Sequence, residues 1–323
     1  MTDLMTASGL GKRYGRRWAL ADCTLRVPQG RVAGLVGPNG AGKTTLLHMA
    51  VGLEKPTTGT LEVLGGRPRD DAGQIGRVGF LAQDTPVYSR LSVADHLRMG
   101  AWTNPNWDAG LAARRIGELG LPPGQRAGKM SGGQRAQLAL TVAMAKRPEV
   151  LILDEPVASL DPLARREFLQ LLMATIAEDK LSVMLSSHLV ADLERVCDYI
   201  IVLASSRVQV AGEVDALLAT HWRLTGPRRD PRTLPADFDV IEESHTDVQT
   251  TLVARCDGPV HDPAWTVGEL SLEDLVLAYM RRARGGGLAS GRGAGDGDTG
   301  NGDGGNGEGG NGDSGSRGLR VLR

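Results

Sequence analysis

The sequence predicts an α/β fold built on a mainly parallel sheet, and three observations indicate it. Several short apolar runs lack polar alternation, which is typical of strands buried on both faces. Helical patterns separate these runs, as connections between parallel strands require. The first run is followed at once by a glycine-rich loop and a helical pattern. The predicted strands lie within residues 31–37, 77–83, 150–156, 181–188 and 199–206.

Length, net charge and cysteine spacing argue against several classes of protein. The 323 residues suffice for one large domain or two smaller ones, and the formal net charge of −1 provides no basic field that would favour a nucleic acid partner. Cys23, Cys197 and Cys256 have neither CxxC nor Cys/His metal spacing, which predicts reduced thiols in a cytosolic protein. Residues 1–15 lack the apolar stretch of a signal peptide, and no apolar run approaches the ~18 residues of a membrane span. We therefore expect a cytoplasmic chain that reaches a membrane only through a partner.

A helical insertion is predicted between two of the strands. From about residue 84 to 147 the sequence has helical patterns and no strand signal. Ser92 and Asp95 have the spacing of a capping box, which places a helix start there. Together with its flanking strands, this segment belongs to a predicted domain of residues 1–221.

The remainder of the chain is predicted as a small α+β extension and a tail. Residues 225–239 are rich in proline and charge and indicate a linker, and residues 239–256 have the pattern of a polar-faced hairpin. A helix capped by Ser271 and Asp274 follows, so the extension spans residues 222–284. Residues 285–323 are dominated by Gly, Asp and Asn and have almost nothing to bury, which predicts a disordered tail.

The loop after the first strand has the spacing of a P-loop, GxxxxGK[ST], between a strand and a helix. Its glycines let backbone N–H groups point at phosphate oxygens, and the following helix adds its positive end. Lys43 would place a charge on the β- and γ-phosphates, and the Thr44 hydroxyl would ligate Mg²⁺. The predicted nucleotide-binding residues here are Gly37, Pro38, Asn39, Gly40, Ala41, Gly42, Lys43, Thr44 and Thr45.

The strand at residues 150–156 supplies two carboxylates for the same site. Asp154 ends the apolar run, where it would hold Mg²⁺ through water. Glu155, the next residue, would orient or deprotonate an attacking water. A strand that ends in Asp-Glu is common by itself, but in order after a P-loop it indicates nucleotide hydrolysis.

With KMSGGQ at residues 129–134 between them, these motifs resemble the ATP-binding subunits of ABC transporters over about residues 4–220. The resemblance implies a P-loop NTPase domain of the ABC type, with an N-terminal antiparallel β element and a helical insertion. It assigns Tyr14 to stacking on adenine, with Trp18 as the alternative. It assigns Gln83 to Mg²⁺ and the attacking water, and His188 to the γ-phosphate.

The same resemblance implies a second group of residues that act across a dimer. Ser131, Gly132, Gly133 and Gln134 match the signature sequence, whose helix N-terminus faces the γ-phosphate bound by a second subunit. Asp161 would cap its own helix, with Pro162 in the first turn, and lie at the dimer interface. Two residues depart from the family pattern: Met130 replaces a leucine, and Ser206 stands where many relatives have a turn glycine.

The implied function is an ATPase, with ATP and Mg²⁺, that drives transport through a separately encoded membrane permease. Two such subunits, identical or different, would close on ATP, and residues 84–96 would contact the permease. The subunit would lie on the inner face of the cell membrane. The residues around NPNWD and in 157–169 and 186–203 are most similar to ATPases of ABC-2-type exporters encoded near GntR-type regulators.

Two other interpretations stay open. One is a soluble ABC ATPase that acts on ribosomes or DNA; such proteins usually have two ATP-binding units or long coiled coils, whereas this sequence has one unit and no heptad insertion. The other is an ATP-dependent regulatory or immunity protein that signals without transport. The transported substrate is not encoded in these motifs.

Overall fold

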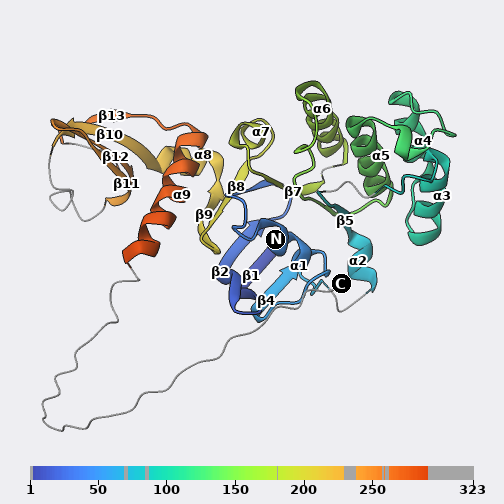
Figure 1. The fold of residues 1–323 in the computed structure, drawn as a ribbon, viewed down its shortest axis with the longest axis horizontal. Helices are drawn as coiled ribbons and strands as arrows, with labels where there is room; N and C mark the ends of the chain where they lie inside the picture. Colours follow the sequence, from blue (N-terminus) through green and yellow to red (C-terminus); the bar gives the residue numbers. More distant parts are fainter. Residues whose placement is uncertain are drawn as a thin grey trace, which may run out of the picture.

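The computed structural model describes residues 3–68, 72–83, 87–179, 181–228, 238–256, 258 and 262–289. Most of the predicted tail, the centre of the predicted linker and Asp84–Pro86 lie outside these residues. A six-stranded sheet forms the centre of the described part (Figure 1). Its strands, in spatial order, are β5 (Val78–Leu81), β6 (Val150–Leu153), β7 (Ser182–Ser187), β3 (Val32–Val36), β8 (Tyr199–Ala204) and β9 (Arg207–Glu213).

The predicted parallel sheet is confirmed, since the first five of these strands are parallel and only β9 pairs antiparallel with β8. Side chains of each central strand alternate between two hydrophobic cores. In β3, Val32 and Val36 belong to one core, whereas Ala33 and Leu35 belong to the other. Both faces are therefore buried, which explains why the strands read as continuous apolar runs.

Each face of the sheet has its own cover. On one side, α1 and the predicted N-terminal antiparallel element pack against the sheet, and that element has the strand order β2-β1-β4. On the other side lie α5, α6 and α7. These elements are β1 (Asp3–Tyr14), β2 (Arg17–Pro28), β4 (Thr58–Val63), α1 (Lys43–Ala50), α5 (Gly132–Ala145), α6 (Pro162–Asp179) and α7 (Val190–Glu194).

The predicted helical insertion follows β5 and forms the lobe at the right of Figure 1. It consists of α3 (Val93–Thr103), α4 (Ala109–Glu118), the 3-10 turn η1 (Ala127–Lys129) and α5, while the short α2 (Ala72–Arg77) precedes β5. The predicted capping box is present at the start of α3. The Asp95 backbone N–H donates to Ser92 Oγ, and the Ser92 backbone N–H donates to the Asp95 carboxylate.

The C-terminal elements are less separate from the main domain than the sequence predicts. A four-stranded sheet of order β11-β12-β10-β13 lies at the left of Figure 1, and α9 connects it to the core. Apolar side chains of α9, among them Leu275 and Val276, belong to the same core as β8 and α7. These elements are α8 (Val214–Thr220), β10 (His221–Pro227), β11 (Asp239–His245), β12 (Gln249–Arg255), β13 (Thr266–Gly268) and α9 (Leu272–Ala289).

Two boundaries differ from the prediction. The segment predicted as a linker from residue 225 begins inside β10, because pairing with β12 and β13 decides the conformation there. The helix α9 continues to Ala289, past the predicted start of the tail at residue 285. Glycines cost a helix only ~1 kcal/mol each, so a helix already packed on a core can extend through them.

The β8–β9 turn keeps its tight geometry although Ser206 replaces the usual glycine. Ser205 and Ser206 both have left-handed backbone angles, with φ of 49° and 63°. Both hydroxyls donate to carbonyls of other elements: Ser205 Oγ to Ala283 of α9 at 3.1 Å and Ser206 Oγ to Trp18 of β2 at 3.0 Å. These bonds offset the strain and tie α9 and β2 to the same turn.

Cys23, Cys197 and Cys256 are all free thiols, and burial raises the pKa of Cys23 and of Cys197. The helices in the part of the chain that the structure describes include none with the length and apolar character of a membrane span.

The capping box of α3 makes stability depend on pH in the acid range. Hydrogen bonds from Ser92, followed by the ion pair with Arg98, lower the pKa of Asp95 to about 2. Ionised Asp95 therefore stabilises the fold above the unfolded-state pKa of about 4, and this contribution is lost as the pH falls toward 2. We expect Asp95→Asn to lower the melting temperature at pH 7 by more than it does at pH 3, measured by circular dichroism.

Glu62→Gln is the matched control for this measurement, since Glu62 is an exposed carboxylate on β4. A melting-temperature deficit of Asp95→Asn that stays constant from pH 7 to pH 3 would contradict the assignment.

Candidate functional site

A cavity of about 640 Å³ lies where β3, β6 and β7 end. The carboxyl ends of neighbouring parallel strands meet at one edge of a sheet, so residues far apart in the sequence converge there. The lining residues are Tyr14, Arg17, Ala19, Pro38, Asn39, Gly40, Gly42, Lys43, Thr44, Thr45, Gln83, Glu155, Ala158 and His188. Most of the residues predicted for the P-loop are in this set; Gly37 and Ala41 lie beneath it.

Two glycines fix the course of the loop for steric reasons. A Cβ on Gly37 would lie 2.1 Å from the carbonyl oxygen of Leu203 in β8, so no larger residue fits between loop and strand. Gly42 has φ of 107° and a Cβ there would lie 2.4 Å from the carbonyl oxygen of Ala19. Gly42 is also the N-cap of α1, whose first backbone N–H groups have no partner inside the helix. The loop therefore presents free N–H donors and a positive helix end to the cavity.

Lys43, Glu155 and His188 form a cluster at the cavity, in which Lys43 and Glu155 are buried and His188 is exposed. Lys43 Nζ donates to the carbonyl oxygen of Gly37 at 2.8 Å and lies 3.3 Å from Glu155 Oε1. The other carboxylate oxygen, Oε2, accepts a hydrogen bond from His188 Nδ1 at 2.6 Å. Lys43 is 6% exposed and Glu155 9%, so each depends on the other for charge compensation. Lys43 and Glu155 are about 110 residues apart in the sequence, and Glu155 and His188 are 33 residues apart, so the cluster joins three distant segments.

The backbone of Glu155 is held in an uncommon conformation. Its φ is 46°, in the left-handed region that costs a residue with a side chain about 1 kcal/mol or more. Its N–H donates to Ser186 Oγ at 2.8 Å, and that hydroxyl donates to Asp154 Oδ1 at 2.7 Å. Ser186, from the neighbouring strand, thus holds the backbone of Glu155 and the carboxylate of Asp154. This arrangement turns Glu155 toward the loop while Asp154 stays beneath it.

The predicted metal ligands have the donor chemistry that Mg²⁺ prefers. Thr44 and Gln83 carry a hydroxyl and an amide oxygen and both line the cavity. Asp154 is only 1% exposed and does not line the cavity; its carboxylate accepts a hydrogen bond from Ser186. A small number of hard oxygen donors fits an ion that keeps several waters.

Tyr14 and Trp18, two aromatic residues of the β1–β2 hairpin, lie in different places. Tyr14 lines the cavity and is 48% exposed, with Lys12 Nζ 5.1 Å from the centre of its ring. Trp18, the predicted alternative, packs elsewhere: its ring lies over Gly11 and is 5.6 Å from the Arg13 guanidinium. Of the two, Tyr14 is therefore placed to contact a bound base.

The signature residues do not line this cavity. Ser131 caps α5, accepting from the Gln134 N–H at 3.1 Å, and Gln134 Oε1 accepts from the Ser131 N–H at 3.0 Å. Asp161 caps α6, with Oδ1 accepting from the N–H groups of Leu163 and Ala164. The two helix starts are adjacent, since a Cβ on Gly133 would lie 3.0 Å from the Ala164 Cβ and one on Gly132 3.7 Å from Leu160. They form a second edge of the molecule, which does not line the cavity.

Sequence reasoning missed two residues of the site. Ser186 lies near the end of β7, two positions before His188, and its hydroxyl is buried. Nothing in the sequence distinguishes it from other strand serines, and its role follows only from its hydrogen bonds to Glu155 and Asp154. Arg17 lies opposite Tyr14 in the β1–β2 hairpin. Hairpin pairing between Tyr14 and Arg17 could have indicated that both face the same cavity.

Comparisons with known proteins agree with this geometry. The protein-family model described as "ABC transporter" matches residues 20–158. The chain is 35% identical over 235 residues to the molybdenum import ATP-binding protein ModC of Mesorhizobium japonicum, covering 69% of this chain and 63% of that protein. It is 33% identical over 247 residues to the probable multidrug ABC transporter ATP-binding protein YbhF of Escherichia coli, covering 72% of this chain and 42% of YbhF. The chain thus spans less than two thirds of both proteins.

Other relatives are covered almost completely. A solved structure described as the ATP-binding subunit of an ABC transporter superposes with a TM-score of 0.59 at 27% identity, covering 67% of this chain and 92% of the other. The phosphonates import ATP-binding protein PhnC 1 of Natronomonas pharaonis is 35% identical over 213 residues, which are 64% of this chain and 91% of PhnC 1. Because the likeness extends over nearly all of such a relative, the chain belongs to the family of ABC transporter ATP-binding proteins, and it is an ATPase.

Proposed function

We propose that this chain is the ATP-hydrolysing subunit of an ABC-2-type exporter, working with a separately encoded permease on the inner face of the cell membrane. The observation that carries ATP hydrolysis in this proposal is the Lys43–Glu155–His188 cluster at the cavity. A phosphate-binding lysine, a candidate base and a histidine are in direct contact there. Family membership supports the transporter context.

We assign distinct tasks to the residues of the site. Tyr14 stacks on the base, and the loop from Gly37 to Thr45 binds the phosphates with Lys43 on the β- and γ-phosphates. Glu155 accepts a proton from the attacking water, while His188 and Gln83 hold the γ-phosphate and that water in position. Thr44, Gln83 and Asp154 would hold Mg²⁺, which supplies charge neutralisation at the phosphates.

A head-to-tail dimer follows from the separation of the two anion-binding edges. The P-loop lines the cavity, whereas Ser131–Gln134 and Asp161 lie outside it. One chain therefore does not bring its own signature to its own nucleotide. We propose that each signature completes the site of a second subunit, so that ATP bridges the two and hydrolysis releases them.

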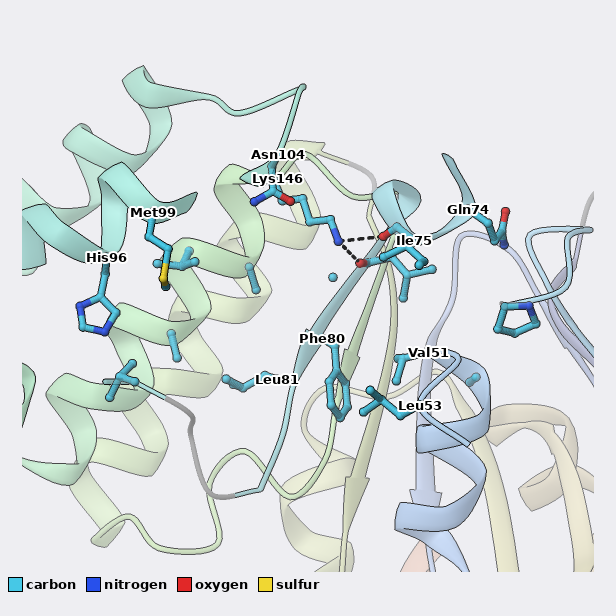
Figure 2. Close-up of a pocket in the computed structure, with 18 residues that line it drawn as sticks. Val51, Leu53, Gln74, Ile75, Phe80, Leu81, His96, Met99, Asn104 and Lys146 are labelled. Atoms are coloured by element: carbon cyan, nitrogen blue, oxygen red, sulfur yellow. Dashed lines mark hydrogen bonds between the residues drawn. The ribbon is translucent and has the colours of Figure 1, made fainter. Parts of the chain in front are cut away.

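A second hollow, of about 370 Å³, supports a docking site for the permease. It lies between the sheet domain and the helical insertion, lined by α1, α2, β5, α3 and α5 (Figure 2). Phe80 and Leu81 of β5 form its floor, and Met99 and His96 approach from α3. Since the wall combines residues from both parts, a helix seated there would respond to movement between them.

The rim of this hollow is apolar and exposed. Leu53 is 58% exposed and Ile75 54%, as expected of residues that are covered by a partner. Lys146 Nζ donates to the carbonyl oxygens of Ile75 at 2.7 Å and Val78 at 2.8 Å, which holds the rim to α5 (Figure 2). Val87 and His96 come from the segment predicted to contact the permease, of which Asp84–Pro86 lie outside the described residues.

We base export on the motif similarity to ABC-2-type ATPases. By their names, ModC and PhnC 1 serve import, and YbhF belongs to a probable multidrug transporter. We further propose that residues 1–221 are the ATPase domain, that the residues from 222 to the end of α9 at Ala289 are an accessory unit and that the residues after it have no catalytic role.

Replacing the candidate base should separate binding from turnover. Glu155→Gln keeps the shape of the side chain but removes the proton acceptor, so we expect ATP hydrolysis to fall at least ~100-fold while ATP binding persists. Gel filtration with ATP should then reveal an accumulated dimer. Glu167→Gln, an exposed carboxylate on α6, should behave as wild type. Near-normal turnover by Glu155→Gln would refute the role of Glu155.

Removing the loop lysine should weaken binding itself. Lys43→Ala deletes a charge-assisted contact to phosphate worth about 1.5–3 kcal/mol, so the affinity for ATP should fall about 10- to 100-fold in calorimetry. Lys55→Ala removes an exposed lysine that does not line the cavity and should leave the affinity unchanged. Equal affinities for Lys43→Ala and wild type would count against the P-loop assignment.

The docking hollow can be tested without touching catalysis. Ile75→Asp places a charge on its apolar rim, so we expect loss of co-purification with the permease while basal ATPase activity stays near wild type. Val248→Asp, at a position 80% exposed in the turn between β11 and β12, is the control and should retain the permease. If Ile75→Asp co-purifies normally, the permease binds elsewhere.

The transporter assignment itself requires identification of the partner. Affinity purification from native cells in mild detergent should recover a polytopic membrane protein without its own P-loop. Recovery of ribosomes or DNA, or of soluble regulators alone, would instead favour the other interpretations. In vesicles with the ATPase facing outward, ATP-driven accumulation of cargo inside would establish export, and ATP-driven loss of cargo would establish import.

A further inference from the structure

Arg17 is a charged residue of the cavity that belongs to none of the nucleotide-binding motifs. It begins β2, pairs with Tyr14 across the β1–β2 turn and lines the cavity together with Tyr14 and Gly40. Its Nη2 lies 3.6 Å from the position that a Cβ on Gly40 would occupy. The guanidinium therefore stands directly over the phosphate loop.

Two basic residues on the β1 side of the hairpin, Lys12 and Arg13, have structural partners, whereas Arg17 on the β2 side does not. Lys12 pairs with Glu54 at 2.6 Å, and the Arg13 guanidinium packs over the Trp18 ring. Among the residues that the structure describes, the Arg17 guanidinium has no hydrogen bond or ion pair with another side chain or carbonyl. The N–H donors of Arg17 are thus available at the side of the cavity formed by the phosphate loop, where Pro38, Asn39 and Gly40 carry no negative charge. This side of the cavity is suited to an anion.

The order of residues along the cavity indicates which part of the ligand Arg17 meets. Tyr14 lies at one side and Lys43 at the base of the loop, so a nucleotide that extends between them passes Gly40 with its inner phosphates. Guanidinium groups bind phosphate oxygens in a bidentate manner. We propose that Arg17 binds the α- and β-phosphates, the part that ADP and ATP have in common, and so contributes to affinity for both. This inference rests on the proposed nucleotide site.

The experiment compares Arg17→Gln with Arg16→Gln in the full chain. Arg16 is the adjacent exposed arginine and does not line the cavity, so both variants lose one charge from the same turn. Dissociation constants are measured by calorimetry for ADP and for a non-hydrolysable ATP analogue at two salt concentrations. We expect Arg17→Gln to weaken both about tenfold and to reduce their salt dependence, with unchanged melting temperature, and Arg17→Lys to recover part of the loss.

Each other result has a defined meaning. Wild-type affinities in Arg17→Gln, or equal losses in Arg16→Gln, would overturn the inference and leave the nucleotide site intact. A loss confined to the ATP analogue would place the guanidinium at the γ-phosphate and overturn the assignment to the shared phosphates. Failure of the wild-type chain to bind either nucleotide would overturn the proposed function and this inference together.

Discussion

The position of β3 in the middle of the sheet is the constraint on which the rest of the site depends. With β7 on one side and β8 on the other, β3 ends at a fixed depth, and Gly37 is pressed against Leu203 of β8. The loop that follows has no freedom to move sideways. Lys43 is thereby brought under the ends of β6 and β7, where Glu155 and His188 meet it. The cluster of Lys43, Glu155 and His188 therefore depends on the order of the strands in the sheet more than on any local motif.

Much of this arrangement could be predicted because its residues obey local rules. Strands buried on both faces read as continuous apolar runs, and the helix starts at Ser92, Ser131 and Asp161 follow capping preferences that need no tertiary information. The loop glycines are equally local in the sequence. What they do in space, above all the contact of Gly37 with β8, becomes visible only once the strands are paired.

The residues that could not be predicted are those whose role depends on contact with a residue far away in the sequence. Ser186 reads as one more strand serine until its hydroxyl is found between the Glu155 N–H and the Asp154 carboxylate. Tyr14 and Trp18 look equivalent in the sequence, and only the packing of Trp18 over Gly11 separates them. The same holds for α9, which composition assigns to an appended unit but whose apolar side chains complete the core of the main domain. Ser205 and Ser206 then connect that helix to β2, on the nucleotide side of the sheet.

The pairing of β3 also has a consequence for biosynthesis. Val32 pairs with Val183, and Ala33 pairs with Tyr199, so the neighbours of β3 are made long after β3 itself. Until residues near Tyr199 have left the ribosome, the phosphate loop has no strands beside it and its apolar stretch stays exposed. The nucleotide loop of the nascent chain therefore stays unformed through most of its synthesis. During that time the cell must keep the exposed apolar segment from associating with other chains, well before the loop can bind ATP.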